Sequence, residues 1–258
     1  MFARLSRMAL MLMLPFALSS CVLAPGKFVS TLSIDANRHF TFTYVGEVLA
    51  LDMNSDMLQG MAPSSNSGDK TDPAGADGDD GTPVLQQIAL QTDSGTTDDD
   101  AKDKAAKKAA AELKNKAIAE ALSKETGFRK VTYMGDGKFI IDYAISGTLD
   151  HAFLWPYNLD AELVFPFIAI ELRGNNTIRV KAPAFANDND KSASTLPGMD
   201  KAASQLDGTF TLDTDAEIVS QNNEEGPVTT AGRRKIVWKA TPLTKDAPVA
   251  VLRMAVPK

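Results

Sequence analysis

The chain has 258 residues and a net charge of -6, because 27 lysines and arginines stand against 33 acidic residues. This acidic balance argues against non-specific binding to nucleic acid, which depends on an excess of cations that neutralise phosphates. The chain contains one cysteine, so it cannot form an intramolecular disulfide.

The first 20 residues have the layout of an export signal. Arg4 and Arg7 form a basic start, an apolar stretch follows up to Leu18, and small residues precede Cys21. A transmembrane helix needs about 20 apolar residues, and this stretch is roughly half as long, so it fits a segment that is cut away. Its removal changes the net charge from -6 to -8, because Arg4 and Arg7 are its only charged residues.

The four residues that end this signal, Leu18-Ser19-Ser20-Cys21, resemble the lipobox of bacterial lipoproteins. In that family the cysteine thiol receives a diacylglycerol group, cleavage exposes the cysteine amine, and the amine is acylated. The resemblance therefore implies cleavage between Ser20 and Cys21 and lipidation of Cys21. A multiply acylated cysteine would hold the protein stably, whereas one fatty chain binds only marginally. The alternative is an ordinary thiol after a secretory signal.

The residue after the cysteine bears on which membrane holds the protein. Val22 stands where many enterobacterial lipoproteins that stay at the inner membrane have an aspartate. The resemblance therefore implies an outer-membrane anchor with the body facing the periplasm.

Residues 28–51 predict a β-hairpin. Leu32 and Ile34 alternate with polar residues before a turn at 35–38, and an aromatic series, Phe40, Phe42 and Tyr44, alternates with threonines after it. Such a pair has one apolar face that needs a partner layer. His39 falls on the polar side and is expected to be exposed.

Residues 52–97 are acidic, of low complexity and rich in turn formers, so they predict a disordered loop. Residues 98–126 are rich in Ala and Lys and predict a long helix, with Gly127 as its stop signal. An apolar stripe on this helix is expected to lie on a sheet, while the Lys-rich face is expected to be solvated, with contact to anionic lipid or a partner as the alternative. The stripe consists of Ala106, Ala110, Leu113, Ala117 and Ala121, with Ile118 and Leu122 beside them.

The rest of the chain predicts strands separated by short turns. Two further hairpins are expected, at residues 128–146 and 161–185, and then single strands at 210–218, 236–240 and 249–254. Hairpins combined with one long helix predict an α+β fold, in which an antiparallel sheet packs against the helix. The predicted organisation is a signal peptide at 1–20, the lipidated cysteine and first hairpin at 21–51, the acidic loop at 52–97, and a body at 98–258 that forms one domain with 21–51.

Both ends of the body resemble the LppM-like domain of bacterial lipoproteins. The closing segment, residues 208–254, has a strand, a polar turn at 222–226 and a strand that carries Trp238, while residues 21–47 are similar to the opening of such proteins. The resemblance implies an exported lipoprotein with a sheet domain. It brings no functional residue besides Cys21.

His151 is the candidate for a catalytic base. Asp150, Asp160 and Glu162 are near it in sequence, and a carboxylate can orient an imidazole as a general base. The alternative is a structural or solvated histidine in a loop beside aromatic residues. An enclosed pocket at His151 would support a periplasmic hydrolase, whereas an exposed His151 would argue against it.

Other motifs give weaker signals. Ser67 and Lys70 have the Ser-x-x-Lys spacing but lie in the acidic loop, where no helix is expected to hold them together. The acidic clusters at 77–81 and 187–190 lack the glutamate that closes an EF-hand loop. The basic cluster Arg233-Arg234-Lys235 suits either anionic headgroups or a solvated turn.

Together these patterns predict a non-enzymatic, lipid-anchored envelope protein that needs no cofactor or metal. It is expected to bind a partner protein or an amphiphile near the membrane, and not nucleic acid. An amphiphile would require an apolar groove, expected between the helix and the sheet. The alternative function is the hydrolase based on His151.

Overall fold

The computed structural model describes residues 21–52, 97–156, 166–174, 176–187 and 199–255. The predicted signal peptide and residues 53–96 of the predicted acidic loop lie outside the described residues. No helix in the described part of the chain is long and apolar enough to cross a membrane.

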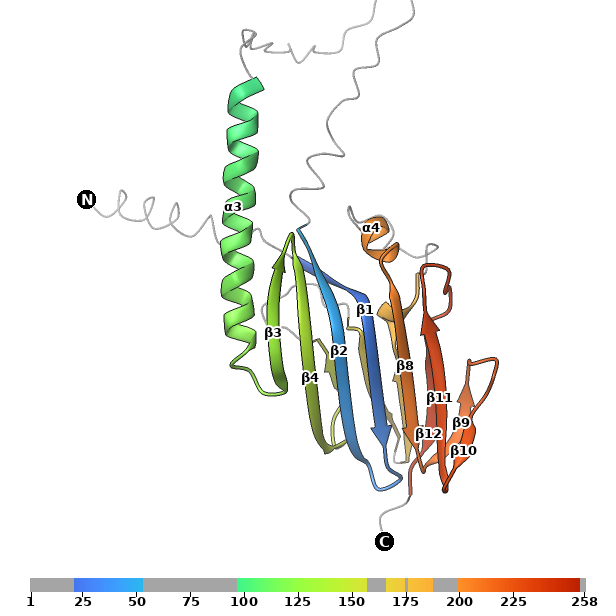
Figure 1. Ribbon diagram of the computed structural model, residues 1–258. Coiled ribbons are helices and arrows are strands. Elements are labelled where there is room, and N and C mark those ends of the chain that lie inside the picture. The colour runs from blue at the N-terminus through green and yellow to red at the C-terminus, as the bar shows by residue number, and fades with distance from the viewer. Residues whose placement is uncertain (1–20, 53–96, 157–165, 175, 188–198, 256–258) are drawn as a thin grey trace, which may run out of the picture.

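Two β-sheets form the body of the protein (Figure 1). The larger sheet has seven strands, which lie in the order β10 (Val228–Thr230), β11 (Arg233–Ala240), β8 (Asp207–Thr214), β1 (Cys21–Ile34), β2 (His39–Asp52), β4 (Lys138–Thr148) and β3 (Phe128–Gly135). The smaller sheet has five, in the order β5 (Phe153–Trp155), β6 (Ile168–Arg173), β7 (Thr177–Lys181), β12 (Val249–Arg253) and β9 (Glu217–Gln221).

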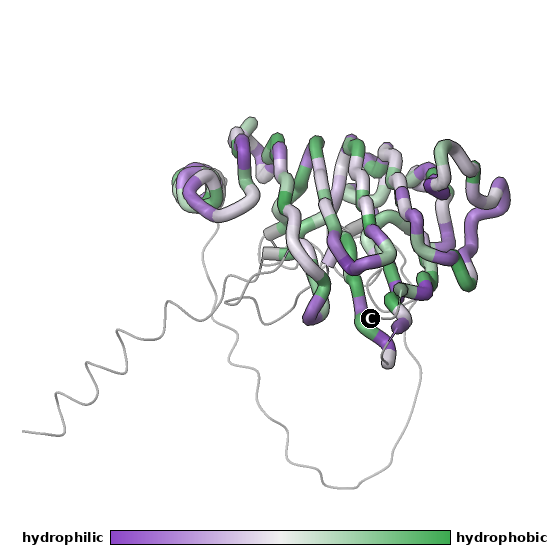
Figure 2. Tube along the Cα trace, turned by 90° about the horizontal axis from the view of Figure 1, so that it is seen from below, coloured by the Kyte–Doolittle hydropathy of each residue, from purple (hydrophilic) through white to green (hydrophobic). Residues whose placement is uncertain are grey.

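The two sheets pack face to face, and a view along the strands shows them as two layers (Figure 2). The long helix α3 (Thr97–Leu122) lies at one edge, beside β3. A short helix α4 (Met199–Ala203) and a 3-10 turn (Pro183–Phe185) complete the elements of the described chain.

Aromatic side chains fill the space between the sheets. Tyr44 of β2 lies 4.7 Å from Trp155 and 5.8 Å from Phe167, measured between ring centroids. Phe28 of β1 stacks on Phe185 with the ring centroids 4.3 Å apart. The second sheet and its connections therefore cover the apolar face of the β1–β2 hairpin.

This packing shows that the predicted α+β fold is wrong. The protein is mostly β, and its core lies between two sheets instead of between one sheet and a helix. The strands are also not all antiparallel, because β8 pairs with β1 in parallel. Alternation of apolar residues identifies a strand, but it does not say which sheet the strand joins or in which direction it runs.

The local hairpin predictions are confirmed. The pairs β1–β2, β3–β4 and β6–β7 are antiparallel and adjacent in the sheets. The strand predicted at 210–218 is wrong, because β8 ends at Thr214 and the chain then crosses to the other sheet as β9. Thr214 fixes this crossing, since its hydroxyl donates to the carbonyl of Ile34 at 2.6 Å and accepts the N–H of Ala216 at 3.0 Å.

The helix was predicted with the correct start but the wrong packing face. It begins at Thr97, ends at Leu122 and is followed by turns up to Gly127. Asn115 and Ala119 are buried and Ile118 is partly buried against the core. The five residues of the predicted stripe are exposed instead, with Leu113 in its middle 69% exposed, whereas Ile118 and Leu122, predicted beside the stripe, are partly buried.

Tyr44 is the largest fully buried side chain of the described core. Its hydroxyl donates to the backbone carbonyl of Glu47 at 2.7 Å, so the buried hydroxyl has a partner. Burial raises the pKa of Tyr44 well above its usual range, and the charge of Glu47 adds to this shift. The core therefore favours the neutral phenol.

Replacement of Tyr44 tests this contribution. At neutral pH, Tyr44→Phe should lower the free energy of unfolding by about 1–2 kcal/mol, because the carbonyl of Glu47 loses its donor. Because the pKa of Tyr44 is higher in the folded state, its full contribution to the free energy of unfolding is present below the pKa of 10.0 in the unfolded chain. This contribution is lost as the pH rises through the pKa of Tyr44 in the folded state. Urea unfolding should therefore show that the gap between wild type and variant narrows above pH 10.0. A gap that stays constant or widens there would contradict the argument.

Candidate functional site

The outer face of the seven-stranded sheet is the surface that the second sheet leaves open. Along β1, Phe28, Ser30, Leu32 and Ile34 are buried, and the residues that alternate with them, such as Val29 and Thr31, lie on the outer face. The outward positions of β1, β2, β8 and β11 are mainly threonine, valine and lysine. They include Val29, Thr31, Thr43, Val45, Thr209, Thr211, Lys235, Val237 and Lys239.

One row of these side chains crosses four neighbouring strands. Lys239 pairs with Thr209, Thr209 pairs with Val29, and Val29 pairs with Val45. The two valines are unusually open to solvent, with Val29 60% and Val45 49% exposed. Scattered exposed apolar residues are ordinary, but here two lie directly opposite each other in the middle of a sheet.

This row lines a shallow depression with a volume of about 490 Å³. Lys27 and Asp207 add to its polar wall, while Gly208 and Phe28 form part of its apolar lining. A side chain at position 208 would not fit there, because a Cβ atom would lie 2.2 Å from the ring of Phe28. Gly208 therefore lets β8 lie close over the aromatic core.

The charges around the depression are mixed. Lys239 donates to the hydroxyl of Thr209 at 2.9 Å, and Lys27 and Asp207 occupy paired positions on β1 and β8. The Glu47 carboxylate adds a negative charge beside the depression, because it accepts the backbone N–H of Lys27 at 3.4 Å, and it lies 3.3 Å from the ammonium of Lys138. The depression thus offers two ammonium groups beside an apolar valine pair, which suits binding. Its lining contains no histidine or cysteine that could act as a nucleophile or base.

The structure places two of the predicted catalytic residues, His151 and Asp150, in the open. His151 is 85% exposed and Asp150 is 74% exposed, and the imidazole contacts the Asp150 carboxylate at the surface. Asp160 and Glu162 lie outside the described residues. The described geometry shows no enclosure around His151, so it counts against general-base catalysis there.

The other predicted site residues divide between the described and undescribed parts of the chain. Cys21 is the first residue of β1, and its backbone pairs with Asp52. Ser20, Ser67, Lys70 and the acidic cluster at 77–81 lie outside the described residues. His39 is exposed, as predicted, and lies 3.8 Å from the Asp35 carboxylate.

No metal centre appears in the described ranges, where no group of three or more His, Cys, Asp or Glu side chains is arranged to hold an ion. Of the acidic cluster at 187–190, only Asn187 is described. It anchors its loop, because its backbone N–H donates to Thr244 at 2.7 Å and its side chain donates to Pro242 at 3.0 Å.

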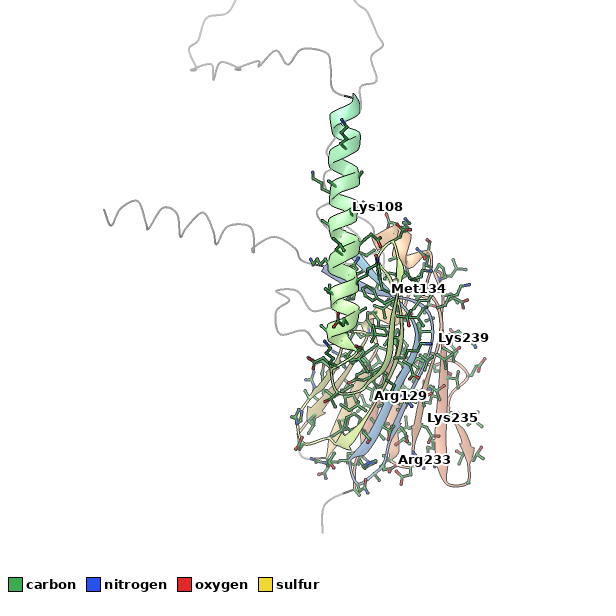
Figure 3. All side chains as sticks on the ribbon, turned by 60° about the vertical axis from the view of Figure 1, so that its left-hand side comes forward. Lys108, Arg129, Met134, Arg233, Lys235 and Lys239 are labelled. Carbon is green, nitrogen blue, oxygen red and sulfur yellow. The ribbon has the colours of Figure 1, made fainter. Side chains whose placement is uncertain are left out.

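Arg233, the first residue of the predicted basic cluster, has a structural role. Its guanidinium forms ion pairs with Asp35, at 2.8 Å, and with Asp213, and it donates to the hydroxyl of Ser33 at 2.8 Å. Hydrogen bonds to Asp35 and Asp213 raise its pKa. Figure 3 shows Arg233, Lys235 and Lys239 spaced along β11, and of the three Lys239 lines the depression while Arg233 lies farthest from Lys239. The residue ties β1, β8 and β11 together, so its charge is largely used within the sheet.

The junction between α3 and the sheet is filled. The Asn115 amide donates to the Tyr133 hydroxyl at 3.3 Å, and Glu112 accepts the backbone N–H of Asp136 at 3.0 Å. Ala119 packs against the core beneath them. These contacts argue against the apolar groove expected between helix and sheet.

The depression was missed at the sequence level because its residues come from opposite ends of the chain. Val29 and Val45 belong to the β1–β2 hairpin near the N-terminus, whereas Thr209 and Lys239 belong to strands close to the C-terminus. The available signal was the presence of Val29 and Val45 among polar residues on the solvent side of a predicted hairpin.

Comparison with known proteins yields a weak structural likeness. No family model matches the chain, and no curated protein matches it. Among solved structures, the folded domain of the LppM protein of Mycobacterium tuberculosis, determined by NMR, matches with a TM-score of 0.30 and 14% identity. The match covers 91% of this chain and 92% of that chain. At this TM-score the likeness does not establish a common fold, and no property of that protein is transferred.

The role of Arg233 can be tested against its neighbour on β11. Arg233→Gln should lower the free energy of unfolding by about 1 kcal/mol, because Asp35 and Asp213 lose their shared cation at a partly screened position. Lys235→Gln is the control, since Lys235 is exposed on the same strand and should leave stability unchanged. Urea unfolding at low and high salt should show the loss shrinking with salt. Equal effects of the two substitutions would contradict the structural role.

Proposed function

We propose that the protein is a lipid-anchored lipoprotein of the bacterial cell envelope that binds a partner protein or an amphiphile and catalyses no reaction. The observation that carries the proposal is the lipobox-like sequence Leu18-Ser19-Ser20-Cys21, whose cysteine is the first residue of β1. By the same resemblance, Val22 favours the outer membrane, with the sandwich facing the periplasm.

The position of Cys21 supports an anchoring role. Val22 and Ala24 are buried, so the folded domain begins immediately after the cysteine. A signal peptide cut before Cys21 would leave the domain whole, because none of its described strands includes residues before Cys21. An acyl group on Cys21 would then attach to the domain without a tether.

The outer face supports the binding role. Its depression combines exposed Val29 and Val45 with Lys27 and Lys239, and no described element covers it. Apolar contact with the valines would provide affinity, and the ammonium groups would orient an acidic group of the partner or amphiphile. The exposed position of His151 gives no support to the alternative hydrolase.

The anchor is tested by replacing its acceptor. Cys21→Ser removes the thiol that would receive the diacylglycerol group, so the variant should lack the lipid mass and move to the aqueous phase in detergent partitioning. Intact mass and partitioning of the full chain, expressed with its signal, measure both effects. Ser19→Ala keeps the cysteine and should stay lipidated, which makes it the control. If wild type and Cys21→Ser are equally soluble and neither carries lipid, the anchor is refuted.

The binding face is tested with two exposed valines. Val29→Gln places an amide in the centre of the depression, whereas Val228→Gln makes the same change on β10 at the sheet edge. Capture of the lipidated protein from its native envelope, with bound proteins and lipids identified, should yield a species that Val29→Gln retains about fivefold less, since roughly 1 kcal/mol of apolar contact is lost. Val228→Gln should retain it fully. A species held equally by both variants would exclude the depression as its site.

A further inference from the structure

The end of the sandwich at which β1 begins has three neighbouring elements. Beyond the last β2–β4 pair, Leu49 with Lys138, the β1–β2 ladder continues for three more pairs and ends at Cys21 with Asp52. The β3–β4 turn lies beside this extension, because Gly137 accepts the backbone N–H of Ala50 at 2.8 Å. The third element is α4, whose Ala202 is buried against Ala24 and Leu49.

Helix α3 extends past this same end. Lys108 forms an ion pair with Asp136 at 2.9 Å, and Glu112 accepts the backbone N–H of Asp136, so the β3–β4 turn lies level with residues 108–112. The preceding residues of α3, from Thr97 to Lys107, continue for about 16 Å at 1.5 Å per residue. Figure 1 shows this part of the helix projecting beyond the sheet on the side where β1 starts and α4 lies.

We infer that this end of the sandwich, formed by the start of β1, the β3–β4 turn, α4 and the first turns of α3, faces the bilayer. The inference rests on the proposed lipid on Cys21. Because Val22 is already buried, no flexible segment separates an acylated Cys21 from the fold, and the end that carries it must lie at the headgroups. The proposed anchor therefore places this surface against the bilayer and not against another protein.

The composition of this end fits the headgroup layer and not the hydrocarbon core. It carries the exposed Lys107, Lys108, Asp136 and Lys201, and the sequence at the start of α3 contains Asp98, Asp99 and Asp100. Figure 3 shows Lys108 and the exposed Met134 at this end, away from Arg233 and Lys235. Since both signs of charge are present, the anchor and not an anionic lipid sets the orientation.

The far end and the binding face are then held away from the membrane. Val29 is eight residues along β1 from Cys21, which corresponds to about 26 Å at 3.3 Å per residue. Lys235, which lies opposite Asp213 and thus near Ser33, is about 40 Å away by the same measure. These spacings define near and far positions for labels.

The single cysteine allows a clean test in the full, lipidated chain. Lipidation consumes the thiol of Cys21, so an introduced cysteine is the one reactive thiol. Lys107→Cys and Lys201→Cys mark the near end, and Lys235→Cys marks the far end as a matched control, since all three lysines are exposed. Each is labelled with a small fluorophore, and quenching by nitroxide-headgroup lipid is measured in vesicles of phosphatidylcholine, with and without phosphatidylglycerol.

The expected result is quenching at 107 and 201 that is several times stronger than at 235, with and without phosphatidylglycerol. Equal quenching at the three positions, or strongest quenching at 235, in a protein whose mass includes the lipid would overturn the orientation while leaving the anchor intact. Absence of the lipid mass would instead overturn the proposed anchor, and the orientation with it. Circular dichroism of each variant confirms that it has folded.

Discussion

The packing of two sheets around the aromatic face of the β1–β2 hairpin is the constraint on which the rest of the structure depends. Tyr44 and Phe28 cannot be exposed at low cost, and Trp155, Phe167 and Phe185 from the second sheet and its connections cover them. Because the second sheet occupies the inner face, α3 is left at the edge, and the outer face stays open. The location of the candidate binding surface is therefore a consequence of how the core is filled.

The parallel pairing of β1 with β8 brings the two ends of the chain together on that surface. It sets Val29 beside Thr209, and Thr209 in turn pairs with Lys239 of β11. Thr214 then turns the chain from one sheet into the other with two hydrogen bonds of its buried hydroxyl. A parallel pair needs a long connection, and here the connection includes the second hairpin and part of the second sheet, so the depression forms only when the whole domain has folded.

The sequence predicts local structure, such as hairpins. It does not predict which strands pair with each other or which face of the helix packs against the sheet. Alternation around the turns at 35–38 and 136–137 located the hairpins, because a period of two and turn residues are properties of adjacent positions. The same alternation could not separate Phe210 from Ile218, which lie in different sheets. The face of α3 was equally ambiguous, since alanines surround the helix, and the buried positions are Ala119 and the polar Asn115, whose amide donates to the Tyr133 hydroxyl. The depression could not be predicted from the sequence, because its lining residues come together only through these strand pairings.

The proposed anchor and the position of the depression together limit the kind of ligand that can bind. In the proposed orientation Val29 would stand away from the headgroups, because it lies about 26 Å from Cys21 along β1 by the rise of a strand. A lipid that stays in the bilayer cannot bring its headgroup to Lys27 and Lys239 across that gap. Under the proposed anchor and orientation, an occupant of the depression would come from the aqueous side, either as a protein segment or as an amphiphile already withdrawn from the membrane. An amphiphile would leave most of its apolar surface uncovered in so shallow a depression, which favours the protein segment.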